Sequence, residues 1–188
     1  MPALPDLPAP LAGDRASLRY AAERDIPEIL IAHQDDPRLF VALGLERPPS
    51  GAQLGRRAEA VAGDRASGTS AWLTITEPGA DLCVGQVDVY ELDWEQLHAE
   101  VCIWVAPRHR DRGIAADALA LVGRWLIESC RIMRVQLLAD PGHAALRRAA
   151  QRAGYVTEGV LRGYLRRRGD RVDVTVLSLV AADLAVVR

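Results

Sequence analysis

The sequence predicts an α/β fold built on a single mixed, largely antiparallel sheet with one parallel β-α-β crossover. The first observation is an amphipathic helix over residues 113–129, whose apolar residues recur at spacings of four, three and four: Ala115, Leu119, Val122 and Leu126. The second is that one strand-like segment precedes this helix, at 98–105, and another follows it, at 132–139. A connecting helix places two strands of one sheet parallel, whereas short connections elsewhere favour antiparallel neighbours.

The first residues suggest the domain organisation. Residues 1–13 carry four prolines and no basic residue, so we expect a flexible tail rather than a signal peptide or membrane span. Residues 14–188 are expected to form one domain. Its first half is expected to contain a strand over 17–21, helices over 23–32, 37–43 and 52–62, and strands over 71–76 and 82–90 joined by a turn at 77–81.

The second half begins with the strand, crossover helix and strand already described. A helix is expected over 144–153, with arginines on its outer side and Gly154 at its end. Two further strands, over 155–162 and 172–180, complete the predicted sheet.

The composition excludes several kinds of chemistry. All 23 residues in the Lys+Arg total are arginine, and the 188-residue chain also lacks asparagine. Catalytic lysines and lysine-containing phosphate loops are therefore excluded. Three cysteines without a CxxC pair indicate neither a disulfide scaffold nor a metal site, and they favour a reducing, cytoplasmic compartment. Few aromatic residues and a net charge of −2 argue against nucleic acid as a partner, and no segment is typical of a membrane protein.

Charge is unevenly distributed along the chain. Residues 1–100 carry eight arginines against 17 acidic residues, a net charge of −9. Residues 101–188 carry 15 arginines against eight acidic residues, a net charge of +7. This asymmetry predicts an anionic partner on the second half and a cationic one on the first. Asp35, Asp36 and the loop 91–95 are candidates for the rim of the cationic partner's site.

A candidate anion site follows the strand that ends at Pro107. An arginine-rich turn leads to Gly113, which opens the long helix. Backbone amides at a helix N-terminus bind anions, and Gly113 and Ala115 leave room for a pyrophosphate. Counter-charge would come from the turn: Arg108, Arg110 and Arg112. The alternative is a solvated basic loop that caps an ordinary helix.

Several motifs occur together in one order. Residues 110–115 fit the pattern Gln/Arg-x-x-Gly-x-Gly/Ala, Gly154 and Tyr155 form a Gly-aromatic pair, and residues 158–162 read Glu-Gly-x-Leu-Arg. Gly169, Asp173, residues 177–179 and Asp183 continue the pattern. On these residues the chain resembles the GNAT acyltransferase superfamily, in particular its RimJ/RimL-like N-acetyltransferases, over about residues 17–184.

The resemblance implies the GNAT fold, with transfer of an acetyl or other short acyl group from coenzyme A to a primary amine in a ternary complex, without a metal. It implies that acetyl-CoA is held by three strand residues, by the turn and by the start of the last helix: Ile103, Trp104, Val105, Arg108, Arg110, Asp111, Arg112, Gly113, Ile114, Ala115 and His143. A protein N-terminus, a polyamine, an aminoglycoside or another small amine would fit as acceptor. Related folds often form homodimers, which this sequence does not dictate.

Acyl transfer needs a base more than an acid. An alkyl ammonium with a pKa of about 10.4 is neutral only about one part in 10³ at pH 7, whereas a thiol with a pKa near 8.5 leaves readily as a thiolate. Glu100 is the candidate base, acting directly or through water. Strand alternation places it on one face with Cys102 and Trp104, although the resemblance implies a bulge that would change this phase. The alternative is a strand-edge acid paired with an arginine.

One position departs from the resembled family. Where that family has Asn-x-x-Ser before the Gly-aromatic pair, with the serine as general acid, this chain has His143 and Leu146. His143 is therefore a second candidate catalytic residue, which would protonate the departing thiolate. Alternatively, it contacts coenzyme A without titrating. The missing serine also leaves open a non-catalytic acyl-CoA-binding or regulatory domain, or a phosphate site for another nucleotide.

Overall fold

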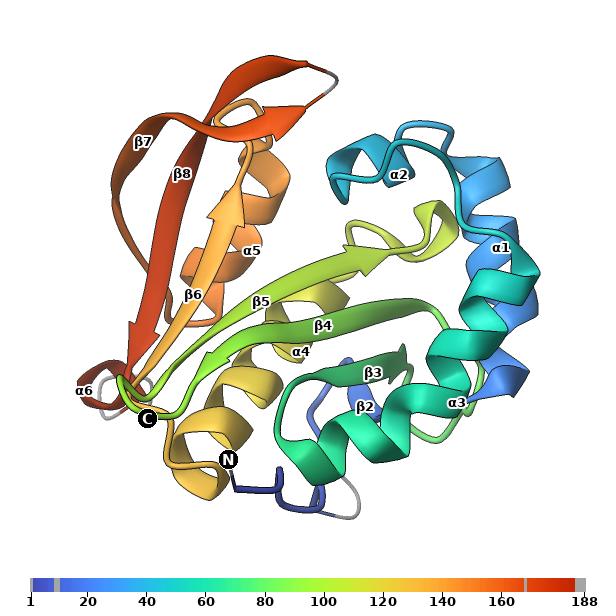
Figure 1. The fold of residues 1–188 in the computed structure, drawn as a ribbon, viewed down its shortest axis with the longest axis horizontal. Helices are drawn as coiled ribbons and strands as arrows, with labels where there is room; N and C mark the ends of the chain where they lie inside the picture. The colour runs from blue at the N-terminus through green and yellow to red at the C-terminus, as the bar shows by residue number, and fades with distance from the viewer. Residues whose placement is uncertain (1, 9–10, 168, 185–188) are drawn as a thin grey trace.

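The computed structural model describes residues 2–8, 11–167 and 169–184, and it contains one eight-stranded sheet (Figure 1). The strand order is β1-β2-β3-β4-β5-β6-β8-β7. The strands are β1 (Leu11–Ala12), β2 (Ser17–Tyr20), β3 (Ala71–Thr76), β4 (Gly85–Asp93), β5 (His98–Val105), β6 (Arg134–Ala139), β7 (Val156–Arg167) and β8 (Asp170–Val180). Only β5 and β6 pair in parallel, so the predicted mixed sheet with one crossover is confirmed.

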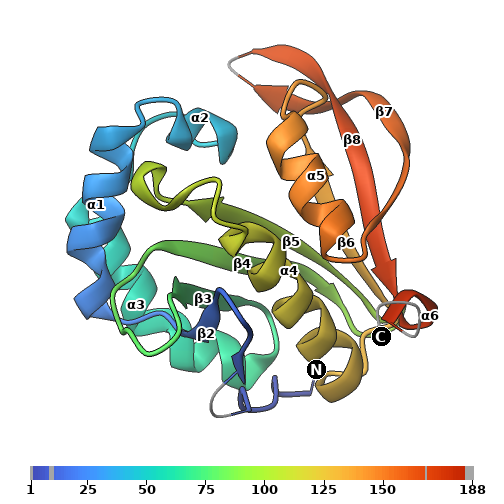
Figure 2. The ribbon, with the colours of Figure 1, turned by 180° about the vertical axis from the view of Figure 1, so that it is seen from behind.

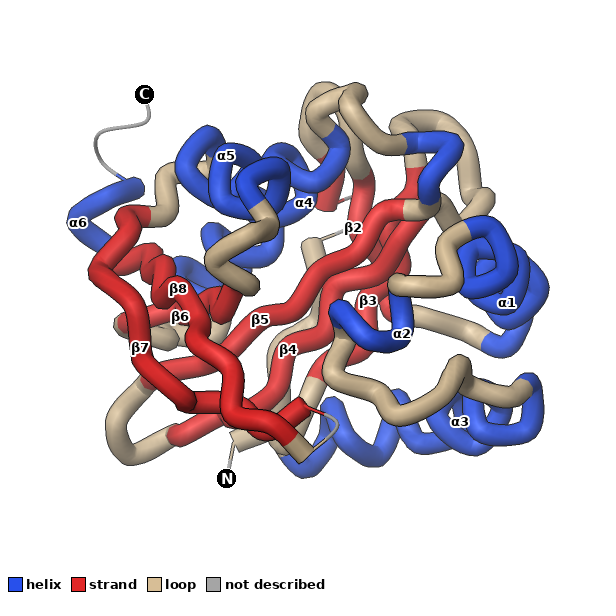
Figure 3. The backbone as a smooth tube through the Cα atoms, turned by 90° about the horizontal axis from the view of Figure 1, so that it is seen from above, coloured by secondary structure: helices blue, strands red, loops and turns tan. Residues whose placement is uncertain are grey.

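Helices cover both faces of the sheet (Figures 2 and 3). Those of the described residues are α1 (Ile26–Asp35), α2 (Leu39–Ala42), α3 (Gly51–Ser67), α4 (Ile114–Arg124), α5 (Ala144–Arg152) and α6 (Ala181–Leu184), and a π-helical turn extends α4 over Trp125–Ser129. One core cluster packs α4 against β4, β5, β6 and β8. A second packs α1, α2 and α3 against Trp72 and Trp104 on the other face. None of the helices within the described residues is long and apolar enough to cross a bilayer.

The pairing of β4 with β5 sets which side chains share a face. Their register runs without interruption from Gly85↔Val105 to Tyr90↔Glu100. The irregularity comes after Tyr90, on the β4 side, because three β4 steps oppose two steps of β5 before Asp93 pairs with His98. The bulge implied for β5 is therefore not in this stretch, and Glu100 stays in phase with Cys102 and Trp104.

The two central strands separate partway along their length. β5 and β6 pair at four positions, from His98↔Arg134 to Val101↔Leu137. Beyond these, β5 continues to pair with β4 and β6 with β8, and the two ribbons diverge in Figure 1. The end of β5 therefore has a free inner edge in the middle of the sheet.

The N-terminal segment contacts the rest of the domain where the structure describes it. Leu4 is buried, and its N–H donates to the Arg65 carbonyl at 2.9 Å. β1 pairs with β2, and the Asp117 carboxylate on α4 accepts hydrogen bonds from the Arg15 and Ala16 N–H groups at 2.7 and 2.8 Å. An apolar side chain and an open sheet edge therefore give this proline-rich segment fixed contacts.

Candidate active site

Glu100 lies on β5 between two hydrogen-bond donors from the neighbouring strands. Tyr90, its cross-strand partner on β4, donates its hydroxyl to Oε1 in a short hydrogen bond. Gln136, its partner on β6, donates its amide to Oε2 at 3.1 Å. Among the described residues no arginine forms an ion pair with this carboxylate, which differs from the alternative of an arginine-paired acid. Glu100 therefore lies one residue before Val101, the last β5 residue that pairs with β6.

A cavity of about 510 Å³ opens beside this carboxylate, on the face covered by α1 and α3. Its floor is the polar face of β4 and β5: Gln86, Asp88, Tyr90, Cys102 and Trp104. Its walls come from α1, α3 and the segment 43–49. Tyr90 lines the cavity and also donates to Glu100, so its hydroxyl joins the cavity to the candidate base.

Burial shifts the titration of the groups around this cavity. It raises the pKa of Asp88, against the opposing effect of the Arg57 guanidinium. It also lowers the pKa of His33, which Asp36 partly offsets. Burial raises the pKa of the Cys102 thiol to about 12, so the thiol stays protonated at neutral pH and is a poor nucleophile. The cavity therefore contains groups for binding rather than for covalent catalysis.

Two buried polar atoms lining the cavity have no hydrogen-bond partner within the described residues: Nδ1 of His33 and Nε2 of Gln86. An unpaired buried polar group costs free energy, so a ligand that supplies partners would recover it. Sequence reasoning missed this cavity because its walls come from distant segments. The signal that could have revealed its floor is the alternation of polar residues along residues 86–90.

On the other side of Glu100, β5 offers unpaired backbone amides. The Ala106 N–H donates to the Val84 carbonyl at 2.9 Å, toward β4. Because amides alternate in direction along a strand, those of Ile103 and Val105 point away from β4, toward the side from which β6 departs. There the parallel ladder has already ended at Val101. These two amides can therefore bind an acyl or amide carbonyl of a ligand lying along β5.

The turn after β5 leads into the N-terminus of α4. Gly113 caps the helix in the left-handed conformation, with φ of +80°, and Asp111 has φ of +61°. The Asp117 N–H makes the hydrogen bond to the Gly113 carbonyl at 3.1 Å, so the amides of residues 114–116 precede the first helical bond. Such amides at a helix N-terminus suit an anion.

The arginines of this turn pair with carboxylates from the first half of the chain. Arg108 pairs with Asp35 at 3.0 Å, and Arg110 pairs with Asp36 at 2.6 Å. Arg112 likewise lies 3.2 Å from Glu77. The arginines expected to be free for a phosphate therefore pair with the carboxylates expected at the rim of the acceptor site, Asp35 and Asp36, and the two sets of charges neutralise one another. A pyrophosphate at α4 would compete with these carboxylates for the arginines.

His143 is the N-cap of α5, just beyond the end of β6. Its Nδ1 accepts a hydrogen bond from the Leu146 N–H at 3.1 Å, so Nδ1 carries no proton in this arrangement and the neutral ring holds its proton on Nε2. An imidazolium would lose this cap, because both of its nitrogens are donors. The capping role and the expected acid role therefore compete.

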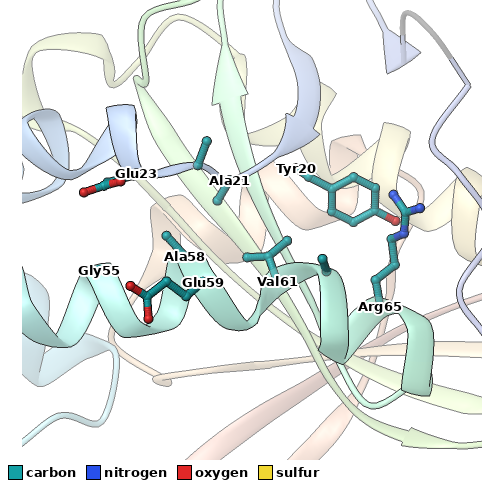
Figure 4. Close-up of a pocket in the computed structure, with 10 residues that line it drawn as sticks. Tyr20, Ala21, Glu23, Gly55, Ala58, Glu59, Val61 and Arg65 are labelled. Carbon is teal, nitrogen blue, oxygen red and sulfur yellow. The ribbon is translucent and has the colours of Figure 1, made fainter.

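A second cavity, of about 390 Å³, lies between the end of β2 and α3 (Figure 4). Its lining is mainly small and apolar, with Tyr20 and Arg65 at one end. The Arg65 guanidinium lies 4.9 Å from the centre of the Tyr20 ring and pairs with Asp6 at 2.8 Å. None of the residues expected to take part in the chemistry lines this cavity.

Comparison with known proteins relates this sequence and fold to a known family. The sequence model of the family described as "Acetyltransferase (GNAT) domain" matches residues 15–156. A Bacillus subtilis (strain 168) protein named "Putative ribosomal N-acetyltransferase YdaF" is 29% identical over 98 residues, which cover 52% of this chain and 53% of that protein. The chain thus spans about half the length of the curated relatives it matches.

Two solved structures show the same fold at low sequence identity. Mycobacterium smegmatis RimJ in complex with CoA-disulfide superposes with a TM-score of 0.80 at 20% identity, over 90% of this chain and 83% of that one. Vibrio cholerae spermidine N-acetyltransferase in complex with CoA and spermine superposes with a TM-score of 0.77 at 16% identity, over 92% of this chain and 99% of that one. Since the family match spans the sheet from β2 to the start of β7, the chain belongs to the GNAT acetyltransferase family.

Proposed function

We propose that this protein is an N-acetyltransferase that moves an acetyl group from acetyl-CoA to an amine by direct attack in a ternary complex. The observation that carries the proposal is the position of Glu100. It lies where β5 and β6 part, with the 510 Å³ cavity on one side and unpaired β5 amides on the other. An acceptor amine and a thioester carbonyl would therefore meet next to a carboxylate.

Coenzyme A would lie along the free edge of β5 and end at α4. The amides of Ile103 and Val105 would bind the pantetheine arm, and the amides of residues 114–116 would bind the pyrophosphate. The adjoining side chains from the turn would complete the site: Trp104, Arg108, Arg110, Asp111, Arg112 and Gly113. Two structurally similar proteins are complexes of coenzyme A or its disulfide, which supports this cofactor.

The reaction then needs one base and one group that stabilises an oxyanion. The amine nitrogen forms a bond to the thioester carbon while Glu100 accepts a proton from it, directly or through the Tyr90 hydroxyl. At pH 7, deprotonating an alkyl ammonium costs about 4 to 5 kcal/mol, which the base helps to supply. The β5 amides stabilise the oxyanion, and collapse breaks the C–S bond with the electron pair leaving on sulfur. Solvent can protonate the thiolate, and His143 is the alternative donor.

The test compares wild type with Glu100→Gln. Titration calorimetry measures acetyl-CoA binding, and a thiol-release assay measures turnover over a panel of amines. We expect Glu100→Gln to lower kcat by about 10²- to 10⁴-fold while the acetyl-CoA Kd stays the same, since the substitution removes a base but no cofactor contact. Glu128→Gln, which removes an exposed carboxylate of the same type far from the cavity lining, is the control.

Other outcomes would favour the other candidate functions. Acetyl-CoA binding without turnover on any amine would favour a non-catalytic acyl-CoA-binding or regulatory domain. Failure to bind acetyl-CoA, together with binding of another nucleotide, would favour a different phosphate ligand at α4. We also propose a cytoplasmic location, supported by the three cysteines, which are all free thiols.

A further inference from the structure

The floor of the cavity beside Glu100 is a ladder of three cross-strand pairs on one face of the sheet. Tyr90 faces Glu100, Asp88 faces Cys102, and Gln86 faces Trp104. Successive pairs are two residues apart, which is about 7 Å along a strand. An acceptor whose amine reaches Glu100 would therefore place its next few atoms over Asp88.

Asp88 is the only carboxylate among the residues that line this cavity, and it is already paired. Arg57 extends from α3 and donates to Asp88 in a short ion pair. Its guanidinium also lies 4.4 Å from the centre of the Trp72 ring, and Trp72 is the cross-strand neighbour of Asp88 on β3. The ion pair and the ring contact together hold Arg57 over the carboxylate.

The rest of the cavity lining adds positive charge and apolar surface. Arg47 adds a second positive charge to the wall, and it is exposed without an ion pair among the described residues. The other wall residues are mainly apolar, including Ile29, Leu54 and Val89. The cavity therefore carries two cations against one carboxylate, within an apolar wall.

We propose that Arg57 determines the acceptor class: by occupying Asp88, it makes the cavity a site for monoamines with an apolar body and excludes amines with a second positive charge. The inference rests on the proposed acetyl transfer. A diamine that reached Glu100 would bring its second ammonium toward Asp88, where it would meet a guanidinium instead of a free carboxylate. Among the acceptors that fit the family resemblance, polyamines and aminoglycosides are thereby disfavoured.

The same geometry predicts how the specificity changes when Arg57 is removed. Without Arg57, Asp88 becomes a partly buried carboxylate with no counter-charge. The second ammonium of a diamine would replace the lost guanidinium and satisfy this carboxylate. Arg57→Gln should therefore admit diamines that the wild type rejects.

The experiment compares two acceptors with the same four-carbon chain: butylamine, with one amine, and putrescine, with two. We expect Arg57→Gln to raise the kcat/KM ratio of putrescine to butylamine by about tenfold, and to tighten putrescine binding by a similar factor in titration calorimetry. Arg56→Gln is the matched control, because Arg56 is the preceding arginine on α3, is exposed and does not line the cavity. The double variant Arg57→Gln/Asp88→Asn should lose the gain.

Three results would overturn the inference: wild type that uses putrescine as well as butylamine, no gain in Arg57→Gln, or an equal gain in Arg56→Gln. If no variant acetylates any amine, the proposed function fails, and putrescine binding alone decides the role of Arg57. Thermal unfolding with and without putrescine reports whether each variant is folded. Arg57→Met, which keeps an apolar stem on Trp72, replaces the glutamine variant if that variant does not fold.

Discussion

At the residue scale, His143 has two roles that require different protonation states. As the cap of α5 its Nδ1 accepts a hydrogen bond from the Leu146 N–H, whereas as a general acid it would have to be an imidazolium. The sequence identified His143 as unusual because it stands where the resembled family has asparagine. It could not reveal the cap, which depends on the backbone at the start of α5.

Asparagine at this position separates the two roles. His143→Asn keeps an N-cap acceptor but has no proton to deliver, so we expect turnover within about threefold of wild type and little change in Tm. His143→Ala should lose about 1 kcal/mol of stability because the cap is gone. Thiol release and thermal unfolding of both variants measure this. A folded asparagine variant that turns over more than tenfold more slowly would instead establish His143 as the acid.

At the element scale, the junction between β5 and α4 depends on Gly113. Its φ of +80° is strained for other residues, and a Cβ added there would lie 3.0 Å from Cδ of Arg15. Gly113→Ala should therefore cost about 1 to 2 kcal/mol and tilt the amides that we assign to the pyrophosphate. We expect acetyl-CoA to bind about tenfold more weakly in calorimetry.

The control is Gly63→Ala in the interior of α3. That glycine has no positive φ and nothing within 4 Å of an added Cβ, so alanine there should be neutral or slightly stabilising. Equal acetyl-CoA affinity in wild type and Gly113→Ala would remove the helix N-terminus from the cofactor site.

The order and type of the main elements could be predicted from the sequence, because hydrophobic periodicity and turn residues are local signals. Their ends could not. β7 and β8 extend to Arg167 and Asp170, beyond the predicted strands. There the two strands continue to pair with each other past the residues at which β8 also pairs with β6. The last turn of the crossover helix is π-helical, which its apolar spacing does not distinguish from an α-helix.

At the scale of the whole molecule, ion pairs within the fold neutralise part of the charge difference between the two halves of the sequence. All three predicted phosphate-binding arginines pair with carboxylates across the fold: Asp35, Asp36 and Glu77. Composition could reveal the imbalance between the halves but not this pairing, which depends on how distant segments meet. The cavity beside Glu100 was missed for the same reason, whereas the shared face of Glu100, Cys102 and Trp104 could be predicted because strand alternation is local.

The C-terminal strands are joined by one charged cluster that should make global stability depend on pH. Hydrogen bonds from Arg134 on β6 and Ser178 on β8 hold Glu158 on β7 and lower its pKa to about 2, against a smaller opposing effect of burial. Because the folded value lies below the ordinary 4.5, the stabilisation is complete above about pH 4.5 and disappears as the pH falls toward 2.

Glu158→Gln should therefore lower Tm at pH 7, and its difference from wild type should shrink progressively between pH 4.5 and 2. Thermal unfolding across this range measures the effect. Glu128→Gln, an exposed acid with no ion pair among the described residues, is the control. A Tm difference that stays constant with pH would show that Glu158 contributes through packing rather than charge.

The separation of β5 and β6 also affects how firmly the two parts of the sheet are held together. Four paired positions and the crossover through α4 connect a five-stranded half of the sheet to a three-stranded half. A ligand lying in the seam, the gap between the diverging ends of β5 and β6, would hold the two parts of the sheet together. Its contacts with the strand backbone would add to a ladder of only four paired positions. Saturation at about 100 times Kd would stabilise the protein by about 2.7 kcal/mol, and hydrogen exchange should slow most in the strands that flank the seam.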